Sequence, residues 1–141
     1  MNRAIIADYV MRHEGKKREL YLDSEGKWTI GVGHCLDTKP ISDRAVMTIF
    51  EDDCMDVERE LTKLVYDFDK LPDRAQMVLF DMVFQLGPGG VQGFKKMLLA
   101  IQERDWDKAA DECLDSKYHR QTPSRCEENA KMLRACKASS S

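Results

Sequence analysis

The chain has 141 residues and a mass of 16.2 kDa, which is the size of one domain with a core of its own. Apolar residues make up 43% and charged residues 33% of the chain, and this balance excludes a wholly disordered protein. The net charge of −3 argues against a dedicated nucleic-acid-binding protein, because such proteins are usually basic.

Residues 1–15 lack the apolar stretch of a secretory signal, and no apolar run approaches the ~20 residues that cross a bilayer. We therefore expect synthesis in the cytoplasm and no insertion into a membrane. The five cysteines form no C-x-x-C arrangement, so we expect no structural zinc site. We expect the thiols to be reduced, and the odd number of cysteines leaves at least one without a partner in the same chain. Cys126 and Cys136 are predicted to share one helix, where their separation of ~15 Å excludes a disulfide between them.

The N-terminal third of the chain changes from a helical to a strand pattern. Apolar residues at helical spacing predict a helix over residues 3–13, and Gly15 is a natural stop. The runs 19–22 and 27–32 flank a glycine-containing turn at 23–26, which predicts a β-hairpin.

A long helix is predicted next, from residue 43 to about 66, with Ser42 as its N-cap and a continuous apolar stripe. Pro72 begins another helix, which is apolar nearly all round and is therefore expected to be the buried centre of a helical lobe. The sequence G-P-G-G at 87–90 is expected to end this helix.

Three shorter helices are predicted to complete the chain, over residues 91–103, 106–115 and 124–136. Thr122 as N-cap and Pro123 at the first helical position begin the last of them.

These elements predict an α+β fold with a small β-hairpin lobe and a larger all-helical lobe, joined by a long helix and separated by a cleft. We expect a single domain over residues 1–141. The β-containing lobe spans about 14–41, the connecting helix about 42–66, and the helical lobe about 1–13 and 66–137.

Glu14 and Asp23 are the candidate chemical groups. Glu14 lies at the negative end of the predicted first helix, where a carboxylate is disfavoured, and a protonated carboxyl is what a general acid requires. Taken singly, a solvated glutamate beside a glycine cap and a turn-forming aspartate explain both residues. As a pair, one on a helix end and one on a hairpin, they could supply the two carboxyl groups that glycoside hydrolysis needs.

Three blocks of sequence carry a family resemblance. They are R-H-E-G with L-Y-L-D-S-E-G-K-W-T-I-G-V-G-H (12–15 and 20–34), M-V-F-Q-L-G with G-V-Q-G-F (82–87 and 90–94), and S-K-Y with Q-T-P-S-R (116–118 and 121–125). In this order, and over most of the chain, they resemble the T-even-type phage lysozymes, which are endolysins of glycoside hydrolase family 24. The resemblance implies the lysozyme-like version of the α+β fold.

The resemblance also implies roles for individual residues. Glu14 matches the family's catalytic acid, and Asp23 matches its catalytic aspartate. Thr29 matches the threonine that lines the cleft beside the attacking water.

Supporting residues are implied in the same way. His34 matches a histidine that pairs with an aspartate on the long helix, here Asp53. Arg125 matches the arginine that hydrogen-bonds near the catalytic glutamate. Phe84 and Gln85 match residues on the helical wall of the cleft.

The activity that the resemblance implies is that of a muramidase. It would hydrolyse the β-1,4 bond between N-acetylmuramic acid and N-acetylglucosamine in peptidoglycan strands, with inversion, and so lyse the host cell as a bacteriolytic endolysin. No cofactor, metal or nucleic acid is implied. We expect a monomer that accumulates in the host cytoplasm and reaches the cell wall through a separate holin.

Two alternatives remain open at this point. A lytic transglycosylase would need Glu14 but not Asp23, and a non-catalytic wall-binding or structural module would need neither. The chain also departs from the T-even enzymes in two ways. The stretch 34–42 is much shorter, which leaves the third strand open, and the chain is acidic where those enzymes are basic, so its attraction to peptidoglycan should be weaker.

Overall fold

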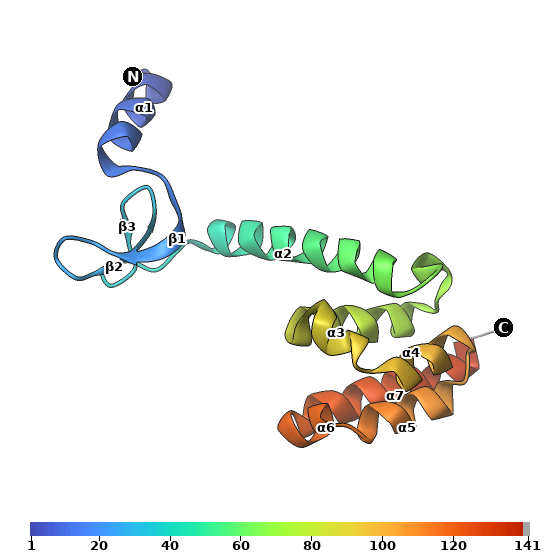
Figure 1. Cartoon of the computed structure of the whole chain (residues 1–141). Coiled ribbons are helices and arrows are strands. Elements are labelled where there is room, and N and C mark those ends of the chain that lie inside the picture. The colour runs from blue at the N-terminus through green and yellow to red at the C-terminus, as the bar shows by residue number, and fades with distance from the viewer. Residues whose placement is uncertain (140–141) are drawn as a thin grey trace. The chain divides into compact units, whose positions relative to one another are not determined.

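The structure is a computed structural model that describes residues 1–139. The chain divides into two compact units, the first spanning Met1–Ile49 and the second beginning at Phe50. Figure 1 labels the helices and strands of both units. The elements are mostly helical with one small antiparallel sheet, which agrees with the predicted α+β class and is consistent with a lysozyme-like fold.

The first unit begins with helix α1, Arg3–Glu14, which confirms the predicted first helix and extends it by one residue. Asn2 caps its N-terminus, because Asn2 Oδ1 accepts a hydrogen bond from the Ile5 amide at 3.2 Å. Gly15 ends the helix in a left-handed conformation, with φ of 80°, and donates its amide to the Met11 carbonyl oxygen at 2.8 Å.

The sheet of the first unit has three antiparallel strands in the order β1-β2-β3. Strands β1, Lys17–Leu22, and β2, Trp28–Gly31, form the predicted hairpin, in which Tyr21 lies opposite Thr29. Strand β3, His34–Cys35, pairs with β2 and was not predicted from the sequence. A strand of two residues carries no alternating pattern, so no sequence signal marks it.

Helix α2, Asp43–Leu64, runs across the boundary between the two units. Ser42 is its N-cap as predicted, because Ser42 Oγ accepts a hydrogen bond from the Ala45 amide at 3.2 Å. A short 3₁₀ helix, η1, follows at Phe68–Lys70.

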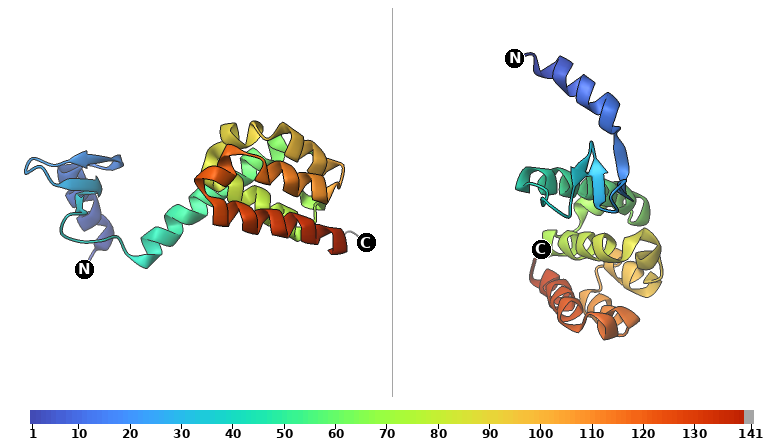
Figure 2. Two further views of the ribbon diagram at one scale, coloured as in Figure 1. Left: turned by 90° about the horizontal axis from the view of Figure 1, so that it is seen from below. Right: turned by 90° about the vertical axis from the view of Figure 1, so that its left-hand side faces the viewer.

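The rest of the second unit consists of five helices among the described residues. They are α3 Asp73–Gln92, α4 Lys95–Gln102, α5 Trp106–Leu114, α6 Lys117–Gln121 and α7 Pro123–Ser139. The two views in Figure 2 show α7 beside α3 and α5, and these helices are in contact. Among the described residues, no helix combines the length and the apolar character that a membrane span needs.

The sequence G-P-G-G interrupts the helix that Pro72 begins, as predicted, because Gly87 is non-helical, with φ of 76° and ψ of 165°. A further helical segment then runs as far as Gln92, which was not predicted. Consequently α4 begins at Lys95 rather than at residue 91. The five-residue helix α6 was not predicted at all. It is too short to show a 3.6-residue period, and its one local signal is Ser116, whose Oγ accepts from the His119 amide at 3.3 Å.

The hydrophobic core lies in the second unit. Helix α3 is its centre, as predicted, and the largest fully buried side chains come from α2, α3, α4 and α7: Leu61, Leu79, Met82, Met97, Ile101 and Leu133. In the first unit, by contrast, Thr29 is the one buried side chain within residues 1–49.

Helices α5 and α7 are also joined by ion pairs on their exposed sides. Asp107 lies 3.4 Å from Arg134 and 2.7 Å from Lys137, and Arg134 also pairs with Asp111. The hydrogen bond from Lys137, followed by its positive charge, lowers the pKa of Asp107 below its usual value. Charge therefore joins the last turns of α7 to α5 in addition to the buried Cys136, whereas the earlier turns contribute Cys126, Ala130 and Leu133 to the core.

Candidate functional site

Glu14, the last residue of α1, has its side chain against the loop between β2 and β3. A Cβ atom at Gly33 would lie 2.6 Å from Glu14 Oε2 and 3.0 Å from Glu14 Cδ. Gly33 also has a φ of 64°, a conformation that glycine adopts at little cost. Because glycine has no side chain, Gly33 leaves free the space that the exposed carboxyl group of Glu14 occupies.

Asp23 lies in the turn of the β1–β2 hairpin and is half-buried. One of its oxygens, Oδ1, accepts hydrogen bonds from the amides of Glu25 at 2.8 Å and Lys27 at 2.9 Å. This is the turn-forming role that the sequence alone suggested. It uses one carboxylate oxygen, and no described hydrogen bond engages the other.

Thr29 is 3% exposed on β2, and its hydroxyl donates to the Lys27 carbonyl oxygen at 3.0 Å. This bond fixes the orientation of the side chain and leaves the hydroxyl oxygen able to accept. Glu14, Asp23 and Thr29 therefore all belong to the first unit, on α1, the hairpin turn and β2 respectively.

His34 and Asp53 lie in different units, so their pairing stays a prediction. His34, in β3, is half-buried, and its Nε2 lies 3.0 Å from the Lys39 carbonyl oxygen. Asp53 is exposed on α2.

Arg125, Phe84 and Gln85 belong to the second unit. Arg125, in the first turn of α7, forms a two-point ion pair with Asp81 of α3, in which Arg125 Nε donates to Asp81 Oδ2 at 2.9 Å. Phe84 packs edge-on against Phe50, with ring centroids 5.7 Å apart. Gln85 Oε1 is buried, and among the described residues it has no hydrogen-bond partner.

Asp81 binds a second side chain besides Arg125. Its Oδ2 also accepts from Asn129 Nδ2 at 2.9 Å, and the same nitrogen donates to the buried Tyr118 hydroxyl at 3.0 Å. The Arg125 hydrogen bond lowers the pKa of Asp81 below its usual value, with partial burial opposing it and the Asn129 hydrogen bond adding to it. Burial raises the pKa of Tyr118 to about 12.

A groove of about 740 Å³ opens beside this network, within the second unit. One side is apolar and includes Phe50, Phe80 and Phe84, while Asp81 and Arg125 form the polar side. The groove therefore contains two of the supporting residues that the sequence singled out, Phe84 and Arg125.

No group of three or more His, Cys, Asp or Glu side chains within residues 1–139 is arranged to hold a metal ion.

Comparison with known families decides the class of protein. A family model described as phage lysozyme matches residues 11–129, which include Glu14, Asp23, Thr29 and Arg125. The chain belongs to the phage lysozyme family.

Individual members of the family are similar over the same part of the chain. Two are the probable T4-type lysozymes 2 and 1 of Dictyostelium discoideum, 30% and 28% identical over 85% of this chain and 88% of each relative. A third is the pre-baseplate central spike protein Gp5 of Enterobacteria phage T4, 31% identical over 85% of this chain. This chain spans 26% of the length of the spike protein.

Three residues that position the candidate site residues in this chain were not singled out from the sequence. Gly33 makes room for Glu14, and Asp81 and Asn129 hold Arg125 and Tyr118. Helical spacing could have suggested two of them, because Asn129 lies four residues after Arg125 and Asp81 three before Phe84, each pair on one helix face. No spacing rule relates Gly33 to Glu14.

Asp81→Asn is expected to lower the free energy of unfolding by about 0.5–1.5 kcal/mol at pH 7, because the amide cannot hold Arg125 as an ion pair. The folded pKa of Asp81 is depressed, so its contribution is present above the unfolded value near ~3.9 and is lost as pH falls through the folded value. Urea unfolding of both proteins at pH 7 and pH 3 measures this difference. Glu128→Gln, in the same groove, is the control. A difference at pH 3 as large as at pH 7 would contradict the expectation.

Proposed function

We propose that the chain is a muramidase-type glycosidase that hydrolyses the β-1,4 bond between N-acetylmuramic acid and N-acetylglucosamine in peptidoglycan. The observation that carries this proposal is the placement of Glu14, at the end of α1, against the side-chain-free backbone of Gly33. Membership of the phage lysozyme family and the similarity to T4-type lysozymes support the same activity.

In the proposed mechanism Glu14 is the general acid that protonates the departing glycosidic oxygen. Asp23, through the carboxylate oxygen that the hairpin turn does not use, activates or positions the attacking water and stabilises the oxocarbenium-like charge. Thr29 helps to hold that water, and its own donor is already engaged with Lys27.

The supporting residues keep the roles that the resemblance implies. Phe84 and Gln85 would line the helical wall of the glycan site, Arg125 would hydrogen-bond near the catalytic glutamate, and His34 would pair with Asp53. The unpartnered Gln85 Oε1 supports a role in binding, because a buried acceptor without a partner is costly unless a ligand or water supplies one.

The arrangement that we propose for the whole chain is that of the family. Residues about 14–41 form the β-containing lobe, about 1–13 and 66–137 form the helical lobe, and about 42–66 connect them within a single domain. The glycan strand would lie in a cleft between the lobes. We further propose an endolysin that acts as a monomer and leaves the host cytoplasm with the help of a holin.

The activity is tested by the clearing of Gram-negative cells whose outer membrane has been made permeable. We expect clearing together with new reducing ends in the released muropeptides. A lytic transglycosylase would instead release anhydro sugars, and intact sacculi would contradict both enzymatic activities.

A second candidate is supported by one observation. The central spike protein of phage T4, whose name describes a structural role, is as similar to this chain as the T4-type lysozymes are. A chain with a purely structural role would leave sacculi intact in the same assay.

The stereochemistry of the reaction is expected to be inverting. Inverting glycosidases leave roughly 6.5–9.5 Å between their two carboxyl groups for a water molecule, and a water held by Asp23 and Thr29 would attack opposite the bond that Glu14 protonates. The first sugar released should then be the α-anomer. Proton NMR of a glycan digest at early times measures this, and a β-anomer appearing first would make Asp23 a nucleophile or the chemistry substrate-assisted.

Gly33→Ala is expected to lower the rate of clearing by roughly 10–100-fold, because a methyl group would displace the Glu14 carboxyl and a shift of ~1 Å can have such an effect. The left-handed backbone also costs about 1–2 kcal/mol of stability. Gly31→Ala is the matched control, since Gly31 has a similar φ of 70° but nothing lies within 4 Å of an added Cβ. Equal rates for the two variants would remove Gly33 from the positioning of Glu14.

A further inference from the structure

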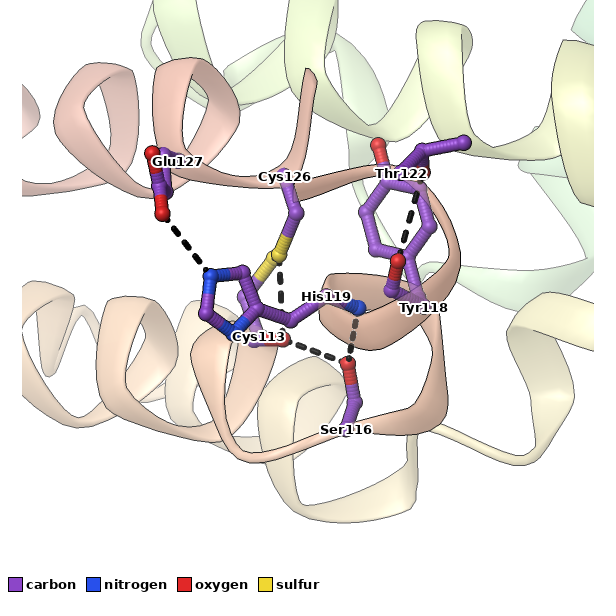
Figure 3. Close-up of polar contacts among 7 residues, drawn as sticks. All are labelled: Cys113, Ser116, Tyr118, His119, Thr122, Cys126 and Glu127. Carbon is purple, nitrogen blue, oxygen red and sulfur yellow. Dashed lines mark hydrogen bonds and ion pairs between the residues drawn. The ribbon is translucent and has the colours of Figure 1, made fainter. Parts of the chain in front are cut away.

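Two buried thiols in the second unit face one another. Cys113 lies near the end of α5 and Cys126 in the first turns of α7, and both are fully buried. Their Sγ atoms lie 3.5 Å apart, and Cys126 Sγ also lies 3.3 Å from the Cys113 carbonyl oxygen. Figure 3 shows the two side chains pointing toward one another from their separate helices.

We propose that Cys113 and Cys126 form a disulfide under oxidising conditions and so tie α5 to α7. A disulfide has its sulfur atoms ~2.05 Å apart, so the present pair needs to close by only about 1.5 Å. The two helices are already packed together. The link would therefore form between two helices that are already in contact, from sulfur atoms that already face one another.

The third buried thiol, Cys136, does not compete for this link. It also lies in α7, ten residues after Cys126, which on one helix is about 15 Å away. Its Sγ donates to the Met132 carbonyl oxygen at 3.4 Å. The remaining cysteines, Cys35 and Cys54, are half-buried.

The segment between the two thiols is already fixed at both ends. Ser116 Oγ donates to the Cys113 carbonyl oxygen at 2.6 Å, and Thr122 Oγ1 donates to the Tyr118 carbonyl oxygen at 3.2 Å. His119 Nε2 lies 3.0 Å from Glu127 Oε1, which joins α6 to α7. Figure 3 shows these contacts around the sulfur pair. A disulfide would close this loop in the unfolded chain as well and so stabilise the folded state.

The chemistry is a thiol–disulfide exchange with a small disulfide such as oxidised glutathione. One protein thiolate attacks the oxidant, forming a mixed disulfide and releasing one small thiol. The second protein thiolate then attacks the protein sulfur of that mixed disulfide, forming the protein disulfide and releasing the second small thiol. The oxidant gains the two electrons that the protein loses, and the two protein protons end on the released thiols.

Burial sets the conditions for this exchange. Desolvation raises the pKa of both thiols above the usual value, so few thiolates exist in the folded protein at neutral pH. Exchange should therefore be slow in the folded state and fast while the chain folds. If the proposed function holds, the protein would meet such oxidants only after leaving the reducing cytoplasm.

The test uses the full chain with Cys35→Ser and Cys54→Ser, which leaves three cysteines. The protein is refolded from denaturant with oxidised and reduced glutathione, alkylated, and digested with trypsin without reduction. Cleavage after Lys and Arg places the three cysteines in separate peptides, 109–117, 126–131 and 135–137. We expect the first two to be joined and the third to be alkylated. The oxidised protein should melt roughly 5–10 °C above its reduced form.

Two matched variants control the assignment. Adding Cys126→Ala should abolish both the joined peptides and the difference in melting temperature, whereas adding Cys136→Ala should preserve both. Three alkylated cysteines after oxidative refolding, or a link through peptide 135–137, would overturn the proposal. None of these measurements uses peptidoglycan, so a failure of the proposed enzymatic function would leave them unchanged.

Discussion

Glu14→Gln is expected to reduce the rate of peptidoglycan hydrolysis at least ~100-fold, because the amide has the shape of the carboxyl group but cannot give its proton to the glycosidic oxygen. The fold should be unaffected, since the Glu14 side chain is exposed and glutamine fits the space beside Gly33 equally well. Release of reducing ends and the melting temperature of the variant measure the two effects separately.

Glu25→Gln is the matched control for this change. Glu25 is another exposed carboxylate of the first unit, and it pairs with Lys27 at 3.4 Å in the hairpin turn. We expect its loss to leave the rate within about twofold of the parent, as exposed ion pairs contribute little. A folded Glu14→Gln protein that still clears cells at the parent rate would remove Glu14 from the reaction.

Asp23→Asn should cause the second large loss of activity and separates the two roles that Asp23 can have. Asparagine keeps an Oδ1 atom that can accept from the Glu25 and Lys27 amides, so the hairpin turn should survive. It removes the negative charge that would activate water and stabilise the oxocarbenium-like state. We expect the melting temperature to stay within a few degrees and the rate to fall roughly 100-fold or more.

The opposite result would be equally informative. If Asp23→Asn retained activity, Asp23 would be a turn-forming residue only, and the lytic transglycosylase alternative, which needs Glu14 alone, would be favoured. Asp37→Asn is a suitable control, because Asp37 Oδ2 likewise accepts a backbone amide, that of Trp28 at 3.1 Å.

The parts of the fold that local rules determine could be predicted from the sequence. The stop at Gly15, the hairpin around residues 23–26 and the Ser42 cap each depend on a few neighbouring residues, and the structure has all three. Such features need no knowledge of the tertiary structure. The central place of α3 in the core agrees with its many apolar residues, but its burial is not all round, because Met77 and Phe84 are exposed.

The features that could not be predicted are either elements that are too short or contacts between residues far apart in the sequence. Strand β3 and helix α6 are too short to show a period, so they leave no pattern. The approach of Glu14 to Gly33 depends on how the end of α1 meets the sheet, which spacing does not encode. The bond between Asp81 and Asn129 joins residues 48 positions apart. Candidate residues could thus be named from the sequence, whereas the contacts that position them could not.

The ion pairs between α5 and α7 make the two ends of α7 respond differently to ionic strength. Exposed charges are screened over about 8 Å at physiological salt and about 3 Å at 1 M, so the contacts of Arg134 and Lys137 with Asp107 should weaken as salt rises. The first turns of α7 also carry an ion pair, between Arg125 and Asp81, but buried Cys126 and Ala130 hold them as well. Salt should therefore weaken the charged contacts at both ends of α7, and most of all those of Arg134 and Lys137, while the buried side chains keep the helix in place.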